Sequence, residues 1–207
     1  MPNYLHLKLP KDFIYNIDSI LNISNTAYGY SVLEPNNIIT ERGMWLLKQI
    51  NVIPKDVILF NNGRANADID TRIIHTDLYN DGEGDQWKRY GFGINLELAD
   101  TVTNFVWWRM DRCTSIIPDL ETHRQSHYNA PKPVGIVRYQ DITGIPDNAT
   151  RLEEVTFTGP VLVRIDVPHS TTYHTNGNKR VGVGIRFDET TFRSWEVVRK
   201  LFLPYAA

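Results

Sequence analysis

The sequence of 207 residues is poor in cysteine and has no long apolar run. With Cys113 as its single cysteine, the chain cannot form an intramolecular disulfide, and a buried, unreactive thiol is the simplest interpretation of that residue. No stretch approaches the roughly 20 apolar residues that a transmembrane helix needs. Residues 1–10 contain no apolar run preceded by positive charge, so they do not resemble a signal peptide. We therefore expect a cytoplasmic protein with no membrane partner.

The chain also lacks an excess of charge of either sign. It has 22 lysines and arginines against 24 acidic residues, which gives a formal net charge of −2 at pH 7. A general electrostatic attraction to nucleic acid requires a strongly basic chain, so the sequence gives no clear nucleic-acid signal. Hydrophobic residues make up 42% and charged residues 22%, the proportions of an ordinary globular protein. This length suits one domain with a substantial core.

The spacing of apolar residues predicts helices near the N-terminus and short strands over most of the remaining chain. Residues 12–23 and 40–50 have the apolar spacing of helices. Turn-forming residues separate the later strands, a pattern typical of a sandwich or a jelly roll. We predict one domain over 1–207, with a helical part at about 1–55, a β core at about 57–187 and a C-terminal helix at about 190–203. The predicted strands are residues 4–9, 57–60, 72–79, 90–99, 103–110, 134–139, 154–157, 161–167 and 180–187.

Two histidines and an aspartate are candidate metal ligands. His75 and Asp77 are two residues apart in a predicted strand, so their side chains should point to the same side of a sheet. His169 follows Pro168 after a row of alternating aliphatic residues, which predicts a position where a buried face meets an opening. Non-haem Fe(II) oxygenases hold iron with two histidines and one carboxylate and leave about three coordination positions open. A structural zinc site would use four ligands, usually including cysteine, and Cys113 alone supports it poorly.

Two arginines share one face of the last predicted strand. Arg180 and Arg186 alternate with apolar residues, and Gly182 and Gly184 lie between them on the same face. A glycine within a strand often marks a place where another group approaches the backbone. A small dicarboxylate could therefore lie against these glycines, with one carboxylate bound by an arginine.

The order His-x-Asp, a distant His and an Arg about ten residues later resembles the 2-oxoglutarate/Fe(II)-dependent dioxygenase superfamily. The matching residues are His75, Asp77, His169 and Arg180, and the resemblance covers about residues 57–187. It implies a double-stranded β-helix, a cupin-like jelly roll braced by the N-terminal helices. It also implies an enzyme, a hydroxylase that uses Fe(II), 2-oxoglutarate as co-substrate and O2, and that releases succinate and CO2.

The same resemblance implies roles for residues around the iron. Arg180 would pair with the 2-oxoglutarate carboxylate that lies away from the metal, with Arg186 as its competitor. Spacing favours Arg180, which follows His169 by 11 residues. Asn95, on the polar side of a predicted strand, would hydrogen-bond the co-substrate.

Several alternatives stay open at the level of sequence. His174 is the alternative to His169 as the second histidine ligand, although its segment is rich in threonine and asparagine and is predicted as a turn. His123 and His127 could share a helical face, but their polar segment is better explained as a solvated helix, a loop or a lid. The alternative function is a non-oxidative cupin-like protein, an isomerase, lyase or binding module; a structural sandwich without metal is the third. The substrate could be a small molecule, an amino acid or a protein, and the oligomeric state is unknown.

Overall fold

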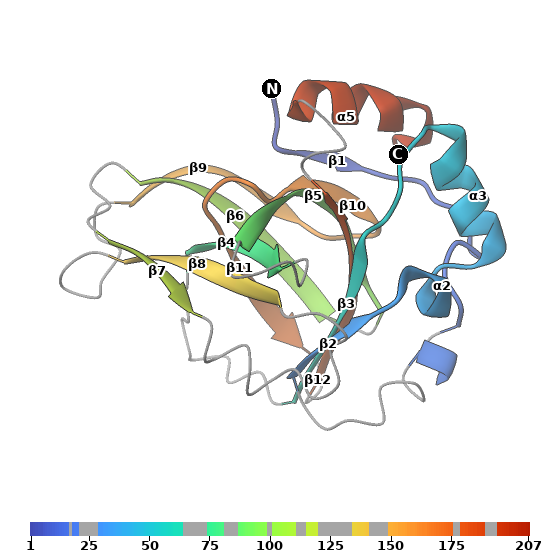
Figure 1. The fold of residues 1–207 in the computed structure, drawn as a ribbon, viewed down its shortest axis with the longest axis horizontal. Helices are drawn as coiled ribbons and strands as arrows, with labels where there is room; N and C mark the ends of the chain where they lie inside the picture. Colours follow the sequence, from blue (N-terminus) through green and yellow to red (C-terminus); the bar gives the residue numbers. More distant parts are fainter. Residues whose placement is uncertain are drawn as a thin grey trace.

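The computed structural model describes residues 1–16, 18–20, 29–63, 74–80, 87–98, 101–110, 115–119, 134–140, 149–175, 179–188 and 194–207. These residues form a mainly antiparallel β structure with helices along one side (Figure 1). The helical elements are α2 (Pro35–Ile38), α3 (Glu41–Gln49), α5 (Trp195–Phe202) and the 3-10 helix η2 (Leu203–Tyr205). The strands are β1 (Tyr4–His6), β2 (Gly29–Leu33), β3 (Asp56–Gly63), β4 (His75–Asn80), β5 (Trp87–Glu97), β6 (Thr101–Met110), β7 (Ser115–Asp119), β8 (Val134–Gln140), β9 (Ala149–Thr156), β10 (Val161–Arg164), β11 (His169–Thr175) and β12 (Lys179–Asp188).

The strands pair into two antiparallel sheets. The first sheet has the order β2-β3-β12-β5-β10-β1. The second has the order β9-β6-β11-β4-β8-β7. The long strand β5 belongs to both, because its first residues also pair with β4 at Leu78–Asn80. Strands β7 and β8 lie on the side of the molecule away from the helices (Figure 1).

A first hydrophobic core lies between the helices and the outer face of the first sheet. Alternate residues of β12, from Val181 to Phe187, contribute to it together with Leu47 of α3 and Phe202 of α5. Helix α3 begins after Thr40, whose side chain accepts a hydrogen bond from the Gly43 backbone N–H. The predicted helix at 40–50 and the described part of the predicted C-terminal helix are therefore confirmed. Within the described part of the chain, no helix has the length and apolar character needed to span a membrane.

A second hydrophobic core lies between the two sheets and includes one of two adjacent tryptophans. Trp107 is fully buried there, and its Nε1–H donates to the backbone carbonyl of Arg164 at 2.8 Å. Trp108 lies on the other face of β6, where its Nε1–H donates to Ser170 Oγ at 2.8 Å and its ring packs near Ile74. The space between the sheets is thus filled by apolar side chains at one end.

The predicted helix at 12–23 is wrong over its described first residues. Residues 11–16 form a turn and an isolated bridge between Ile14 and Ile39, and only 18–20 are helical; residues 17 and 21–23 lie outside the described residues. The backbone carbonyl of Phe13 accepts a hydrogen bond from the Thr40 N–H, so tertiary contacts to the segment before α3 replace helical ones. The segment 1–55 is not purely helical: it contains β1, which lies within the predicted strand at 4–9, and β2, which was not predicted.

The predicted strand at 161–167 is shorter than expected, and a further strand follows it. Strand β10 ends at Arg164, and β11 begins at His169 in a segment predicted as a turn. The alternation of the aliphatic row nevertheless holds, since Val161, Val163 and Ile165 all lie in the core between the sheets.

Candidate metal centre

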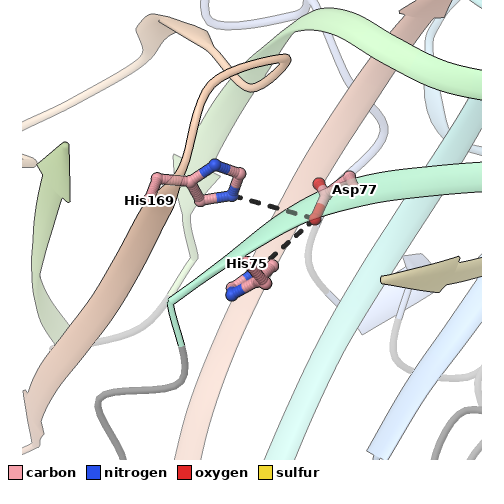
Figure 2. A group of neighbouring side chains, drawn as sticks. All are labelled: His75, Asp77 and His169. Carbon is pink, nitrogen blue, oxygen red and sulfur yellow. Dashed lines mark ion pairs between the residues drawn. The ribbon is translucent and has the colours of Figure 1, made fainter. Parts of the chain in front are cut away.

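The three predicted metal ligands come together on two neighbouring strands. His75 and Asp77 lie on β4, and His169 is the first residue of β11. The antiparallel pairing of these strands places His169 directly opposite His75. Figure 2 shows the three side chains converging, with both imidazoles next to the carboxylate. Residues more than ninety positions apart in sequence therefore become cross-strand neighbours.

The three donor groups lie close enough together to approach a single divalent cation. Asp77 Oδ1 lies 3.5 Å from His75 Nε2 and 3.8 Å from His169 Nε2. One donor atom from each residue lies within 4.8 Å of the other two. Donors about 2.1 Å from one ion, at right angles to each other, are about 3.0 Å apart. Movements below about 1 Å would therefore bring the carboxylate and each imidazole to metal-binding distance.

His169 is held in an orientation suited to metal binding. The residue is only 2% exposed, and its Nδ1 lies 2.9 Å from the Val167 carbonyl oxygen. Donation from Nδ1–H to this carbonyl leaves the Nε2 lone pair directed at Asp77. The ring stacks on Phe105 with centroids 4.7 Å apart. Burial, followed by the charge of His75, lowers the pKa of His169 to about 3, so the imidazole is neutral near pH 7, as a metal ligand must be.

Asp77 is ionised although it is buried. Burial alone raises the pKa of this carboxyl, but the positive charge of Arg186 and the hydrogen bond from His75 outweigh that effect and hold it well below its usual range. Arg186 Nε donates to Asp77 Oδ2 at 3.0 Å. One carboxylate oxygen thus faces the arginine, and the other faces the histidines.

Two of the residues assigned to the co-substrate lie next to this group. Arg186 is 3% exposed, and its Nη1 donates to Asn95 Oδ1 at 2.7 Å. Asn95 on β5 lies opposite Gly184 on β12, so the pairing of these strands brings Asn95 and Arg186 together. The structure therefore places Arg186 directly on the ligand Asp77 and links Asn95 to that ligand through Arg186.

Arg180 is less completely described. Its backbone lies in β12, opposite Asn62, and its side chain lies outside the described residues. It is six positions before Arg186, which places its Cα atom about 20 Å along the strand from that of Arg186. The sequence-based preference for Arg180 over Arg186 stays a prediction.

The other histidines are not part of the described group. His174 lies in β11 opposite Val102, five positions from His169. Five strand positions separate the two Cα atoms by about 16 Å, which disfavours His174 as a ligand of the same ion. Its side chain, and the whole of His123 and His127, lie outside the described residues.

A buried polar pair near the site was missed by sequence reasoning. The Tyr90 hydroxyl donates to Asp56 Oδ2 at 2.6 Å, and both residues are buried. Asp56 lies directly opposite Arg186 in the pairing of β3 with β12. Burial, followed by the charge of Asp56, raises the pKa of Tyr90 well above its usual value. The only signal in the sequence was an aspartate immediately before the aliphatic row of β3.

Comparison with known proteins adds no assignment to this geometry. No family model matches the chain, and no curated protein is similar to it in sequence. What the site can do must therefore be argued from its own donors: two imidazoles and one carboxylate can bind a divalent metal from one side and leave its other positions to further ligands.

Proposed function

We propose that this chain is a 2-oxoglutarate- and Fe(II)-dependent dioxygenase, a hydroxylase, built on a double-stranded β-helix. The observation that carries the proposal is the convergence of His75, Asp77 and His169 from two paired strands. Imidazole and carboxylate donors in this ratio suit non-haem Fe(II), whose open positions can accept a chelating co-substrate and O2.

The strand order supports the fold part of the proposal. Eight strands, β3, β4, β5, β6, β9, β10, β11 and β12, can be numbered one to eight along the chain. Their order is then 1-8-3-6 in the first sheet and 2-7-4-5 in the second. The first strand pairs with the eighth, the second with the seventh, the third with the sixth and the fourth with the fifth. A long antiparallel hairpin coiled into two sheets gives this pattern, which is that of a jelly roll.

Each residue of the site has a distinct task in the proposed reaction. Iron, when bound, would supply Lewis acidity and redox chemistry for the oxidative decarboxylation of 2-oxoglutarate to succinate and CO2, coupled to hydroxylation of a substrate. His75 and His169 would each offer Nε2 as a donor, and Asp77 would offer one carboxylate oxygen. Arg180 would bind the far carboxylate of the co-substrate. Asn95 would hydrogen-bond the co-substrate from β5.

We also propose a substrate class and a cellular compartment for this protein. The substrate is a small molecule, an amino acid or a protein residue, since neither charge nor composition indicates nucleic acid. A reducing cytoplasm suits both an Fe(II) centre and a chain with one cysteine.

Turnover without the primary substrate tests the function directly. The protein would be purified anaerobically, loaded with Fe(II), mixed with 2-oxoglutarate and exposed to air, and succinate would be measured by mass spectrometry. We expect slow succinate formation that requires added Fe(II) and disappears in His75→Ala. Absence of both 2-oxoglutarate binding and succinate would overturn the proposal. Metal binding under those conditions would instead favour the non-oxidative cupin-like function.

A further inference from the structure

We propose that Arg186 is a positioning residue that holds Asp77 as a one-oxygen metal ligand, and that Gly184 is part of the metal centre because it makes room for the Arg186 guanidinium. This inference rests on the metal-binding part of the proposed function and is independent of the co-substrate. The contacts around the Arg186 side chain support both roles.

The first step is the division of the Asp77 carboxylate between two sets of partners. Arg186 Nε donates to Oδ2 at 3.0 Å, while Oδ1 lies 3.5 Å from the nearer imidazole nitrogen, that of His75. A charge-assisted hydrogen bond to Oδ2 opposes chelation of one ion by both oxygens. It also fixes the plane of the carboxylate so that Oδ1 points at the histidines. Partners that orient a ligand in this way are a general feature of metal sites.

The second step is that Arg186 is itself fixed at several points. Its Nη1 donates to Asn95 Oδ1 at 2.7 Å, and its Cζ lies 5.8 Å from the centre of the Phe60 ring. The residue is 3% exposed, so few other arrangements are available to it. The planar guanidinium places donors toward Asp77 and Asn95 at once, which a lysine ammonium at the end of a flexible chain cannot reproduce.

The third step is the space that the guanidinium occupies. A Cβ added at Gly184 would lie 2.6 Å from Arg186 Nη1 and 2.9 Å from both Cζ and Nη2. A Cβ added at Gly93, on the adjacent strand, would also lie 2.6 Å from Nη1. These separations are too short for real carbon contacts. The guanidinium therefore occupies space that side chains on β5 and β12 would otherwise fill, and a side chain at Gly184 or Gly93 would force it to move.

Gly184→Ala is the sharpest perturbation of this arrangement. The three nearest atoms to its added methyl group all belong to the Arg186 guanidinium, so that group must move. Gly93→Ala is less selective, because its methyl would also approach the Ile185 carbonyl oxygen at 2.9 Å. We expect Gly184→Ala to weaken metal binding by about 10- to 100-fold, the usual effect of losing a group that orients a ligand. The measurement is anaerobic calorimetric titration with Co(II) or Fe(II), without 2-oxoglutarate.

Two glycines provide matched controls. Gly182→Ala adds a methyl to the same face of β12, but its nearest neighbour is Glu97 Oε2 at 2.8 Å rather than Arg186. Gly159→Ala adds a methyl that meets no atom within 4 Å. Metal affinity in both controls should stay within about twofold of wild type, since neither contacts a group that orients a ligand. An equal loss of affinity in Gly182→Ala and Gly184→Ala would overturn the inference.

A double-mutant cycle separates positioning from a general loss of structure. Arg186→Gln should weaken metal binding by about 10- to 100-fold. Adding Gly184→Ala to Arg186→Gln should cost little more, because the atoms that the methyl displaces are already gone. Fully additive losses would overturn the inference. Thermal melting of each metal-free variant identifies any variant that fails to fold. If the Gly184→Ala variants fail, the metal affinity of Arg186→Gln alone tests the positioning role. A wild-type affinity in Arg186→Gln would overturn the inference.

The same titrations, together with the succinate assay, distinguish the positioning role of Arg186 from the proposed dioxygenase function. The positioning role alone would be overturned if wild-type protein forms succinate and both Gly184→Ala and Arg186→Gln bind metal as tightly as wild type. Wild-type protein that binds metal through His75 but does not turn over 2-oxoglutarate would overturn the dioxygenase alone. A wild-type protein that binds no metal at these side chains would overturn both.

Discussion

Replacing His75 by alanine should remove most of the stabilisation that a metal ion gives the folded protein. His75 supplies one of three donors, with its Nε2 3.5 Å from Asp77 Oδ1. A metal that binds only the folded state stabilises it by about 2.7 kcal/mol at 100 times its dissociation constant. For a chain of 207 residues, each kcal/mol raises Tm by about 2–4 °C, so we expect a rise of about 5–11 °C in wild type.

The variant should respond far less at the same metal concentration. If loss of one donor weakens binding by about 100-fold, the metal is then at its dissociation constant and contributes only about 0.4 kcal/mol. The rise in Tm should shrink to about 1–2 °C. The assay is anaerobic scanning calorimetry with and without Co(II). His6→Ala is the control, because His6 lies in β1, where its ring contacts Tyr4. A full metal-dependent rise in His75→Ala, or none in wild type, would refute the reasoning.

Three further substitutions test other parts of the structure. Gly43→Ala should lower the free energy of unfolding by about 1–3 kcal/mol, because a Cβ there would collide with the Phe13 carbonyl oxygen. Urea denaturation measures this change, and an unchanged free energy of unfolding would contradict the packing described. Tyr90→Phe removes the hydroxyl that donates to Asp56 and should cost about 1–3 kcal/mol at pH 7. Because the pKa of Tyr90 is raised in the folded state, the unfolded chain releases the hydroxyl proton at a lower pH than the folded protein does. The wild-type protein should therefore lose stability as pH rises above about 10, and Tyr90→Phe should lose less. Arg180→Ala should raise the KM for 2-oxoglutarate by about 10- to 100-fold in succinate assays, and an unchanged KM would leave that role to Arg186.

The features that could be predicted from sequence are those fixed by local periodicity. His75 and Asp77 share a strand face because strand side chains alternate, and the structure places both donors together. The same alternation gives β12 an apolar face, which packs on the helices. Thr40 is a good N-cap, and α3 begins immediately after it.

The features that could not be predicted depend on contacts between distant segments. Residues 12–23 have a helical apolar spacing, but in the described part of this segment the Phe13 carbonyl and Ile14 pair with the segment before α3. Strand β11 is rich in threonine and polar residues and has no apolar face, so its pairing with β6 could not be read locally. The contact between Arg186 and Asp77 could not be predicted for the same reason. Its partner Asp77 lies 109 residues earlier, and only the sheet pairing brings the two together.

The central claim is that His75, Asp77 and His169 bind one divalent metal ion. Crystals of protein loaded with Co(II), measured at the cobalt absorption edge, test it most directly. We predict one anomalous peak about 2.0–2.2 Å from each of the two imidazole nitrogens and one Asp77 oxygen. A peak elsewhere in the molecule, or an ion at this place with the His169 imidazole turned away from it, would contradict the claim.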